Sequence, residues 1–360
     1  MENPRPEAST IGSRSLTVLS VAFPLAPVGG DAVGGAEQVL ALLDRGLVAA
    51  GHHSIVIACA GSRCDGELVA TPRPQGPLDE HAVAQARDWH RHTIERVLYE
   101  SPVDLIHMHG IDFDSYLPPP GPVVLATLHL PPAWYPAEVF ALARPRTYLS
   151  CVSASQQREC PATTQLVATI DNGVDLELLR PGSGEVRAYA LALGRICPEK
   201  AFHRALDAAR RADTPMLLAG KVYAYAEHQR YFREQLRPRL DAQRRFIGAI
   251  DARRKRALMA GARCLLIPSE AAETSSLVAM EALACGTPVI TFGAGALAEI
   301  VEHGRTGFVV GDEAEMAEAI GRAHEIDRTV CRRAAEQRFN AHRMIAGYLD
   351  LYTELLEFPE

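Results

Sequence analysis

The 360-residue sequence lacks the cysteine patterns of a disulfide framework or a zinc centre. Its eight cysteines form no C-x-x-C pair and no zinc-ligand spacing, so we interpret them as small buried hydrophobic residues in a reducing compartment. Long apolar runs are also missing: residues 1–14 are polar, and the run from Leu16 is broken at Pro24 and Pro27. We therefore expect no signal peptide, no transmembrane span and a cytoplasmic protein.

An excess of positive charge is likewise absent. The formal net charge of −7 argues against general nucleic-acid binding, which needs a basic face. Two local basic runs, 237–245 and Arg253 to Arg256, are interpreted as solvated helix faces. The alternative for these runs is peripheral contact with an anionic membrane surface.

The composition is that of a soluble globular protein, with 48% apolar and 22% charged residues. Its length corresponds to about two domains at the usual 100–200 residues each. Short apolar strands alternate with helical segments, which predicts doubly wound parallel sheets in the α/β class. The expected strands are 16–23, 54–60, 103–109, 123–129, 148–155, 165–170, 189–193, 216–219, 245–249, 263–267 and 289–292.

The Asn-Gly step at Asn172-Gly173 predicts a turn that divides the chain into two Rossmann-like halves with a ligand cleft between them. Residues 61–80 read as a proline-rich loop, and a helix is expected from about 335 to 356. No internal repeat is present. The expected organisation is a disordered tail at 1–14, domains at 15–171 and 172–334, and a C-terminal helical segment at 335–360.

Two glutamates stand in the strand-loop-helix unit of residues 265–295. Glu273 lies in the loop before the helix and Glu281 lies within it, with seven residues between them. Strand ends and helix N-termini are where open α/β sheets bind ligands, so the pair can hold two parts of one extended polar ligand. The alternative is that both are ordinary charges of a helix. Thr274, Ser275 and Ser276 are expected to cap the first turn of that helix.

Two further features suit an anion. Gly34 and Gly35 precede a helix, where glycine lets backbone N–H groups approach a phosphate; an ordinary flexible loop is the alternative. Arg195 and Lys200 flank the start of another predicted helix and form an anion site, unless they are simply solvated cations.

Histidines and an Asp-x-Asp triplet mark the ends of the first-half strands. His109 and His129 end strands where a side chain can donate to a ligand hydroxyl, although strand alternation turns either His107 or His109 inward. Asp112 and Asp114 have the spacing of a metal-diphosphate site. Their proline-rich context instead favours a role in loop structure or an acceptor contact, so no metal is expected.

The sequence around these residues resembles that of the retaining glycosyltransferases of family four, which have the GT-B fold. The resemblance rests on ETSSLVAMEALACGTPVI at 273–290 with GALAEIVEHGRTGFVV at 295–310, GGAEQVLALLDRGLVAAGHHSIVIA at 34–58, TLHLPP at 127–132, NGVD at 172–175 and GRICPEK at 194–200. Two departures are present. Ser275-Ser276 stands where the family commonly has Phe-Gly, and Ala201 replaces a glycine, which we interpret as a mild change because alanine suits a helix start.

The resemblance implies two Rossmann-like domains, an acceptor domain and then a nucleotide-sugar donor domain, with the last helix crossing back to the first. It implies donor-sugar contacts for Glu273 and His129, and a ribose contact for Glu281. Arg195 and Lys200 would form a diphosphate clamp. The further implied donor-binding residues are Gly34, Gly35, Ser275, Ser276 and Leu277, and the implied acceptor or sugar contacts are His109 and Asp112.

The implied function is metal-independent transfer of a sugar, with retention, from a UDP-, GDP- or ADP-sugar to a glycan, lipid-linked or small-molecule hydroxyl. No cofactor is expected. Acceptor contacts are expected from the loops at 61–80 and 111–122. Three alternatives stay open: a GT-B sugar phosphorylase, a nucleotide-sugar epimerase, or a non-catalytic protein that binds nucleotide sugars.

Overall fold

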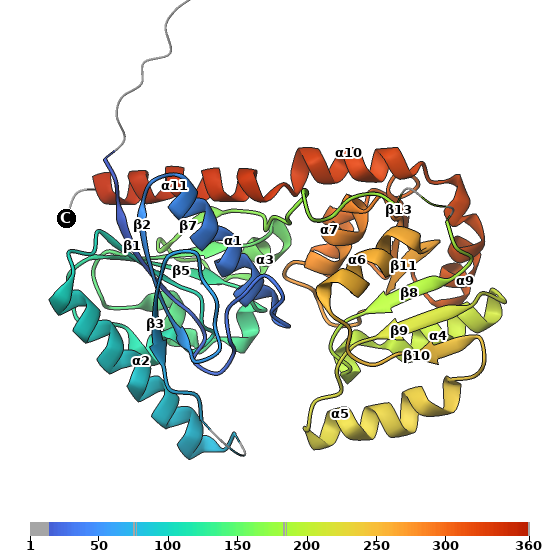
Figure 1. The fold of residues 1–360 in the computed structure, drawn as a ribbon, viewed down its shortest axis with the longest axis horizontal. Coiled ribbons are helices and arrows are strands. Elements are labelled where there is room, and N and C mark those ends of the chain that lie inside the picture. Colours follow the sequence, from blue (N-terminus) through green and yellow to red (C-terminus); the bar gives the residue numbers. More distant parts are fainter. Residues whose placement is uncertain (1–13, 75, 77, 183, 185, 359–360) are drawn as a thin grey trace, which may run out of the picture.

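The chain forms two α/β domains that lie side by side (Figure 1). The computed structural model describes residues 14–358 except 75, 77, 183 and 185, so the tail expected at 1–14 lies, apart from Arg14, outside the described residues. Each domain contains one parallel sheet. Most of the strands arise from short runs of Val, Ile, Leu and Ala that are buried on both faces, as parallel sheets covered by helices require.

The first domain has a seven-stranded sheet in the order β3-β2-β1-β4-β5-β6-β7. Helices α1 and α11 cover one face of this sheet, and α2 with the short helices after β4 and β5 covers the other. Its strands are β1 Thr17–Val21, β2 His53–Cys59, β3 Glu67–Thr71, β4 Leu105–Met108, β5 Val123–Leu128, β6 Thr147–Cys151 and β7 Leu166–Thr169. Its helices are α1 Gly35–Ala49, α2 Glu80–Glu100, η1 Phe113–Tyr116, η2 Pro132–Trp134, η3 Ala137–Ala141 and α3 Ala154–Glu159.

The second domain has a six-stranded sheet in the order β10-β9-β8-β11-β12-β13, so both sheets share the strand order 3-2-1-4-5-6 of a doubly wound fold. Its strands are β8 Ala190–Leu193, β9 Met216–Ala219, β10 Arg244–Phe246, β11 Cys264–Ile267, β12 Val289–Thr291 and β13 Gly307–Val309. Its helices are η4 Pro198–Lys200, α4 Phe202–Arg211, α5 Ala226–Tyr231, η5 Phe232–Leu236, η6 Arg237–Arg239, α6 Ala252–Gly261, α7 Leu277–Ala284, α8 Leu297–Ile300, α9 Glu313–Arg322, η7 Ala323–Glu325 and α10 Arg328–Arg338.

The expected loop at 61–80 is wrong in its middle, where the chain forms β3. This strand pairs in parallel with β2 from Ile55↔Glu67 to Cys59↔Thr71 and forms one edge of the sheet. Its residues are mostly half-buried or exposed, so they give no apolar run in the sequence. The core strands are predictable because burial of both their faces produces a continuous apolar run.

The helix expected from about 335 to 356 is two helices. Helix α10 packs in the core of the second domain through Cys331 and Ala335, and α11, Ala341–Glu357, then packs on the first domain. The chain crosses at Phe339-Asn340, and the Asn340 side chain accepts a hydrogen bond from the His342 N–H at the start of α11. Figure 1 shows both helices, in red, along one edge of the two domains.

The eight cysteines are free, and six of them are buried, as expected for small hydrophobic residues. Among the described residues, no helix combines the length and apolar character needed to cross a membrane.

Candidate functional site

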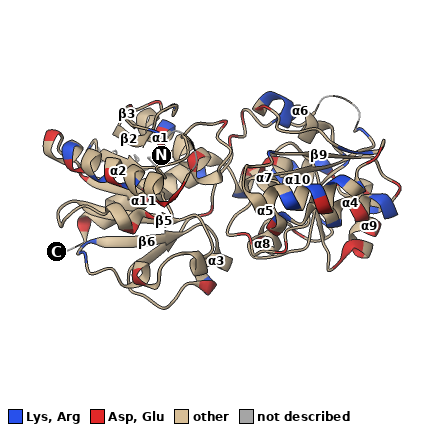
Figure 2. Cartoon of the chain, turned by 90° about the horizontal axis from the view of Figure 1, so that it is seen from below, with Lys and Arg blue, Asp and Glu red and all other residues tan. Residues whose placement is uncertain are grey.

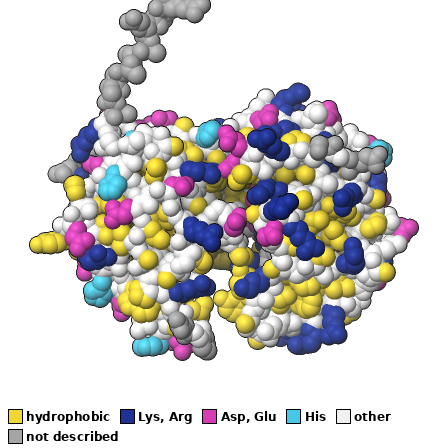
Figure 3. All heavy atoms as spheres, viewed as in Figure 1, with side chains coloured by type: hydrophobic (Ala, Val, Ile, Leu, Met, Phe, Trp, Pro, Cys, Tyr) yellow, Lys and Arg dark blue, Asp and Glu magenta, His cyan; other side chains and the backbone are white. Residues whose placement is uncertain are grey.

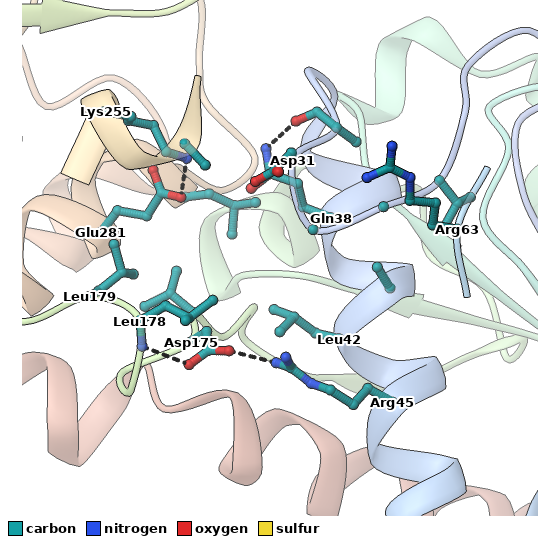
Figure 4. A pocket seen from close by; sticks show the side chains of 18 of the residues that line it. Asp31, Gln38, Leu42, Arg45, Arg63, Asp175, Leu178, Leu179, Lys255 and Glu281 are labelled. Carbon is teal, nitrogen blue, oxygen red and sulfur yellow. Dashed lines mark hydrogen bonds and ion pairs between the residues drawn. The ribbon is translucent and has the colours of Figure 1, made fainter. Parts of the chain in front are cut away.

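A cleft of about 690 Å³ opens between the two domains. The loop before α1 and residues of α1 line one side, and α6 and the start of α7 line the other. Figure 3 shows charged side chains around the hollow between the domains, and Figure 4 shows Asp31, Gln38 and Arg63 facing Lys255 and Glu281 across it. Arg45 and Asp175 form an ion pair of 2.7 Å between the first domain and the interdomain segment. The cleft is therefore polar and built from both domains.

Glu281 and Lys255 form the polar centre of the second-domain wall. The Lys255 Nζ lies 2.6 Å from Glu281 Oε1, and both side chains are largely buried. Glu281 Oε2 is buried and has no hydrogen-bond partner among the described residues. Because a buried acceptor left unpaired is costly, this oxygen suits a hydroxyl of a bound ligand.

The role of Lys255 corrects the interpretation of the basic run at Arg253 to Arg256 as a solvated face. Arg253 and Arg254 are exposed on α6, where Figure 2 shows basic residues, but Lys255 and Arg256 line the cleft. Lys255 was missed because its basic neighbours hide the α-helical spacing that turns it inward.

A second cluster joins Lys200, Glu273 and Ser269. The Lys200 Nζ and Ser269 Oγ both donate to Glu273 Oε1, at 2.5 and 2.6 Å. Lys200 ends the η4 turn after β8, and Glu273 follows β11, so the carboxyl ends of adjacent strands bring them together. Backbone bonds from Glu273 N to Ala294 O and from Ala296 N to Glu273 O hold this loop in place.

Arg195 lies exposed just after β8 and acts across the domain boundary. Burial raises the pKa of Glu37 on α1, and the charge of Arg195 partly offsets this rise. Glu37 is the acid of the G-G-A-E motif, and it was not singled out although the motif contains it. Beside it, a Cβ on Gly35 would lie 3.4 Å from Leu277 Cδ1, so the starts of α1 and α7 meet at the cleft.

The histidines at the ends of β4 and β5 form a buried network. His107 contacts the Tyr352 hydroxyl through Nδ1 at 2.6 Å and Thr127 Oγ1 through Nε2 at 2.7 Å. His109 Nδ1 lies 3.0 Å from His129 Nε2. The prediction that one of the first two packs inward is correct for His107, but His109 is buried as well. Only His129 stays partly accessible, and its carbonyl accepts a bond from Thr274 Oγ1 at 2.8 Å.

This burial predicts a loss of stability in acid. Burial lowers the pKa of His129 and of His90 to about 4, and holds His107 and His109 well below the usual range. Between about pH 6.5 and 4 the unfolded chain therefore binds protons that the native protein does not, and the free energy of unfolding falls as pH falls. We expect roughly 1 kcal/mol per pH unit for each such histidine, measured by urea denaturation from pH 7 to 5.

The matched variants are His90→Leu, which removes a fully buried imidazole, and His342→Ala, which removes an exposed one. The first is expected to flatten the pH dependence and the second to leave it unchanged. Equal slopes in both would contradict the assignment.

Asp112 is fully engaged inside the first domain. Arg87 Nε donates to its Oδ2 at 2.7 Å and the Tyr116 hydroxyl donates to its Oδ1 at 3.0 Å. Both oxygens thus fix the loop after β4, which agrees with a role in loop structure. A direct acceptor contact would have to displace one of these partners.

Two expectations about helix starts are wrong. Ser276 is the first residue before α7, but its side chain makes no capping bond, and the Ser275 hydroxyl is buried without a partner among the described residues. Thr274 instead reaches across to His129. Ala201 does not begin a helix: it adopts the left-handed conformation, φ 46° and ψ 35°, between η4 and α4, a conformation that favours glycine.

Ala201 is also fully buried, so a β-branched residue is expected to fit neither the backbone nor the space. Ala201→Val is predicted to lower the free energy of unfolding by more than about 2 kcal/mol, whereas Ala201→Gly stays within about 1 kcal/mol of the parent. Chemical denaturation measures both. Ala224→Val, at an exposed loop alanine, serves as the control and is expected to be neutral. Equal effects at the two positions would contradict the strain argument.

The structure thus groups the expected site residues into two neighbouring sets. Leu277 and Glu281 line the cleft, and the Lys200-Glu273 pair lies at the loop that leads into the same helix, α7. His129 reaches this loop from the first domain through its bond with Thr274, and Gly34 precedes α1. Neither of them lines the cleft, and Arg195, Lys200 and Glu273 also lie outside its lining.

Two family models match the two halves of the chain. The model for Glycosyltransferase Family 4 matches residues 33–178, and the model for glycosyl transferases group 1 matches residues 187–325. The chain belongs to glycosyltransferase family 4. Its two parallel-sheet domains are the GT-B fold of that family.

Relatives of known name match parts of the chain. The D-inositol 3-phosphate glycosyltransferase of Saccharomonospora viridis is 31% identical over 223 residues, which cover 54% of this chain and 52% of that protein. The N-acetyl-alpha-D-glucosaminyl L-malate synthase of Bacillus anthracis is 33% identical over 107 residues, 28% of each chain. The matched segments therefore span at most about half the length of these family members.

Solved structures match over nearly the whole chain. AviGT4, a glycosyltransferase involved in avilamycin A biosynthesis, has a TM-score of 0.72 at 24% identity and covers 96% of this chain and 99% of its own. The Anabaena protein HepE, in complex with UDP-glucose, has a TM-score of 0.70 at 19% identity, over 94% and 100% of the chains. At these identities the likeness establishes the shared GT-B fold.

Proposed function

We propose that this family 4 protein transfers a sugar from a nucleoside-diphosphate sugar to an acceptor hydroxyl with retention of anomeric configuration. The observation that carries this proposal is the Lys200-Glu273 pair at the carboxyl ends of β8 and β11, next to the interdomain cleft. A cation there can meet the leaving diphosphate while the carboxylate holds the sugar.

The chemistry requires stabilisation of negative charge. As the glycosidic bond breaks, the nucleoside diphosphate leaves with its bonding electrons, and fixed cationic donors lower the energy of that state. Lys200 and Arg195 supply two such charges, and the start of α1 at Gly34 and Gly35 offers backbone N–H groups from the first domain. In this proposal the diphosphate is neutralised by these groups without a divalent metal.

In this proposal Glu281 and Glu273 bind two different parts of the donor. The unpaired Oε2 of Glu281 accepts from ribose hydroxyls, with Lys255 fixing the other oxygen at 2.6 Å. Glu273 accepts from sugar hydroxyls once its bond with Lys200 loosens toward the phosphate. His129, held by His109, donates to the same sugar from the first domain. No side chain is assigned as a covalent nucleophile, so the reaction takes place on one face of the sugar.

The neighbouring structure of HepE, solved with UDP-glucose, supports a nucleotide-sugar donor, but the base in this chain is left to UDP, GDP or ADP. The acceptor is a hydroxyl of a glycan, lipid-linked or small-molecule compound. We place the reaction in the cytoplasm, in glycan assembly; contact of the exposed Arg253 and Arg254 with an anionic membrane surface fits a lipid-linked acceptor.

The test is transfer from a panel of UDP-, GDP- and ADP-sugars to a panel of hydroxyl acceptors, with product anomers assigned by NMR. EDTA-treated protein is compared with and without added Mg²⁺ or Mn²⁺. We expect one donor class, a product with the anomeric configuration of the donor, and no requirement for either ion. An inverted product would contradict retention. Turnover only with inorganic phosphate, or without any acceptor, would instead indicate a phosphorylase or an epimerase.

A further inference from the structure

A cluster of three metal-binding side chains lies beside Arg195 and Lys200. Cys197, Glu199 and His228 each place one ligand atom so that all three atoms lie within 4.8 Å of one another. Cys197 and Glu199 belong to the η4 turn, and His228 belongs to α5. No part of the proposed transfer reaction uses these three groups.

The cluster is partly buried: Cys197 is buried, His228 is half-buried and Glu199 is exposed. Cys197 is only 2% exposed, and its thiol points toward the Arg195 carbonyl at 3.6 Å. His228 Nδ1 is buried and has no hydrogen-bond partner among the described residues. A buried imidazole nitrogen without a partner is costly, so a ligand that bonds to it stabilises the native state. The unpaired nitrogen is an observation independent of the clustering itself.

We propose that Cys197, Glu199 and His228 form a zinc site that ties the η4 turn to α5. Thiolate, imidazole and carboxylate are the ligands that Zn²⁺ takes, and a thiolate disfavours Mg²⁺ and Ca²⁺. With metal-ligand bonds of about 2.0–2.3 Å, tetrahedral ligand atoms lie roughly 3.5 Å apart, so small side-chain rotations close the site. Water fills the fourth position.

This cluster cannot be recognised from the sequence alone. The two ligands of η4 are adjacent to the clamp residues, whereas the third comes from the helix after the next strand, β9. No zinc-ligand spacing results along the chain, because the ligands are brought together by the turn that follows β8 and the loop that follows β9.

The proposed zinc site would hold the stretch of backbone that lies between the two cations of the clamp, Arg195 and Lys200. Arg195 precedes Cys197, and Lys200 follows Glu199 directly. A zinc ion bound to both ligands fixes the turn that spaces the two cations and adds positive charge beside the diphosphate. Zinc is therefore expected to tighten the binding of nucleoside diphosphates about two- to tenfold without being required for transfer.

The experiment is a titration of the chelator-treated full chain with Zn²⁺, in competition with a chromophoric chelator, followed by Co²⁺ spectroscopy. We expect one tight equivalent, and a thiolate-to-cobalt charge-transfer band. Cys197→Ser and His228→Ala are each expected to weaken zinc at least tenfold, and Cys197→Ser to abolish the band. Two matched controls, Cys64→Ser and the neighbouring Glu227→Gln, are expected to retain both.

Thermal unfolding shows whether each metal-free variant is folded and whether zinc stabilises it. Metal-free variants that melt with the parent are folded, and zinc is expected to raise the midpoint of the parent and not that of His228→Ala, at a partly exposed position. A charge-transfer band that persists in Cys197→Ser, or no tight zinc at all, would overturn the proposal. These readouts need no sugar, so they stand apart from the proposed transferase activity.

Discussion

Lys200→Ala is expected to lower kcat at least tenfold, toward a hundredfold, with a smaller change in KM. In the proposed mechanism Lys200 faces the leaving diphosphate, whose negative charge grows only as the glycosidic bond breaks, so its loss raises the barrier more than it weakens donor binding. The variant also leaves Glu273 with Ser269 as its remaining side-chain partner. Steady-state kinetics with the donor identified by the transfer assay measures the effect.

A second clamp variant and a control variant complete the test. Arg195→Ala is expected to lower kcat by at least tenfold as well, because the proposed mechanism has both cations acting on one diphosphate. Arg96→Ala, which breaks an exposed ion pair with Glu100 on α2, is expected to be neutral. Unchanged turnover in both clamp variants would remove Arg195 and Lys200 from the mechanism.

The second large effect is expected at the helix that joins the domains. Tyr348 on α11 is fully buried against the first sheet, with its hydroxyl 3.1 Å from Thr127 Oγ1 and its ring 5.1 Å from that of His107. Tyr348→Ala is expected to lower the free energy of unfolding of the first domain by about 3–5 kcal/mol, as for other large aromatic truncations. Urea denaturation followed by circular dichroism measures it.

Tyr99→Ala is the matched control, since Tyr99 is 93% exposed on α2. Its effect is expected to stay within about 0.5 kcal/mol. A loss below about 1 kcal/mol for Tyr348→Ala would mean that α11 rests on the first domain without stabilising it. Such a result would also mean that the histidine network does not depend on its contact with α11.

The fold was predictable where its physical signal is local. Core strands such as β5 and β11 are continuous apolar runs because helices cover both their faces. The edge strand β3 has no such run, so the sequence predicts a loop there. The break between α10 and α11 was missed because helical periodicity continues across Asn340, whose capping role depends on where α11 packs.

The candidate site was predictable as residue types but not as contacts. The E-x7-E spacing and the GRICPEK turn identified Glu273, Glu281, Arg195 and Lys200 from the sequence. The pairing of Lys255 with Glu281, and the approach of Glu37 to Arg195, depend on how two domains meet. No local pattern encodes that geometry. The left-handed backbone at Ala201 was likewise misread, because alanine by itself favours a helix.

The most direct test of the central claim is thermal unfolding of the chelator-treated protein against UDP, GDP, ADP and their sugar conjugates. Binding to the native state alone raises the midpoint according to ligand concentration and affinity. The account predicts that one nucleotide class raises the midpoint in EDTA, and that Lys200→Ala reduces the shift caused by the free diphosphate. No shift with any nucleotide would contradict a donor site in this cleft.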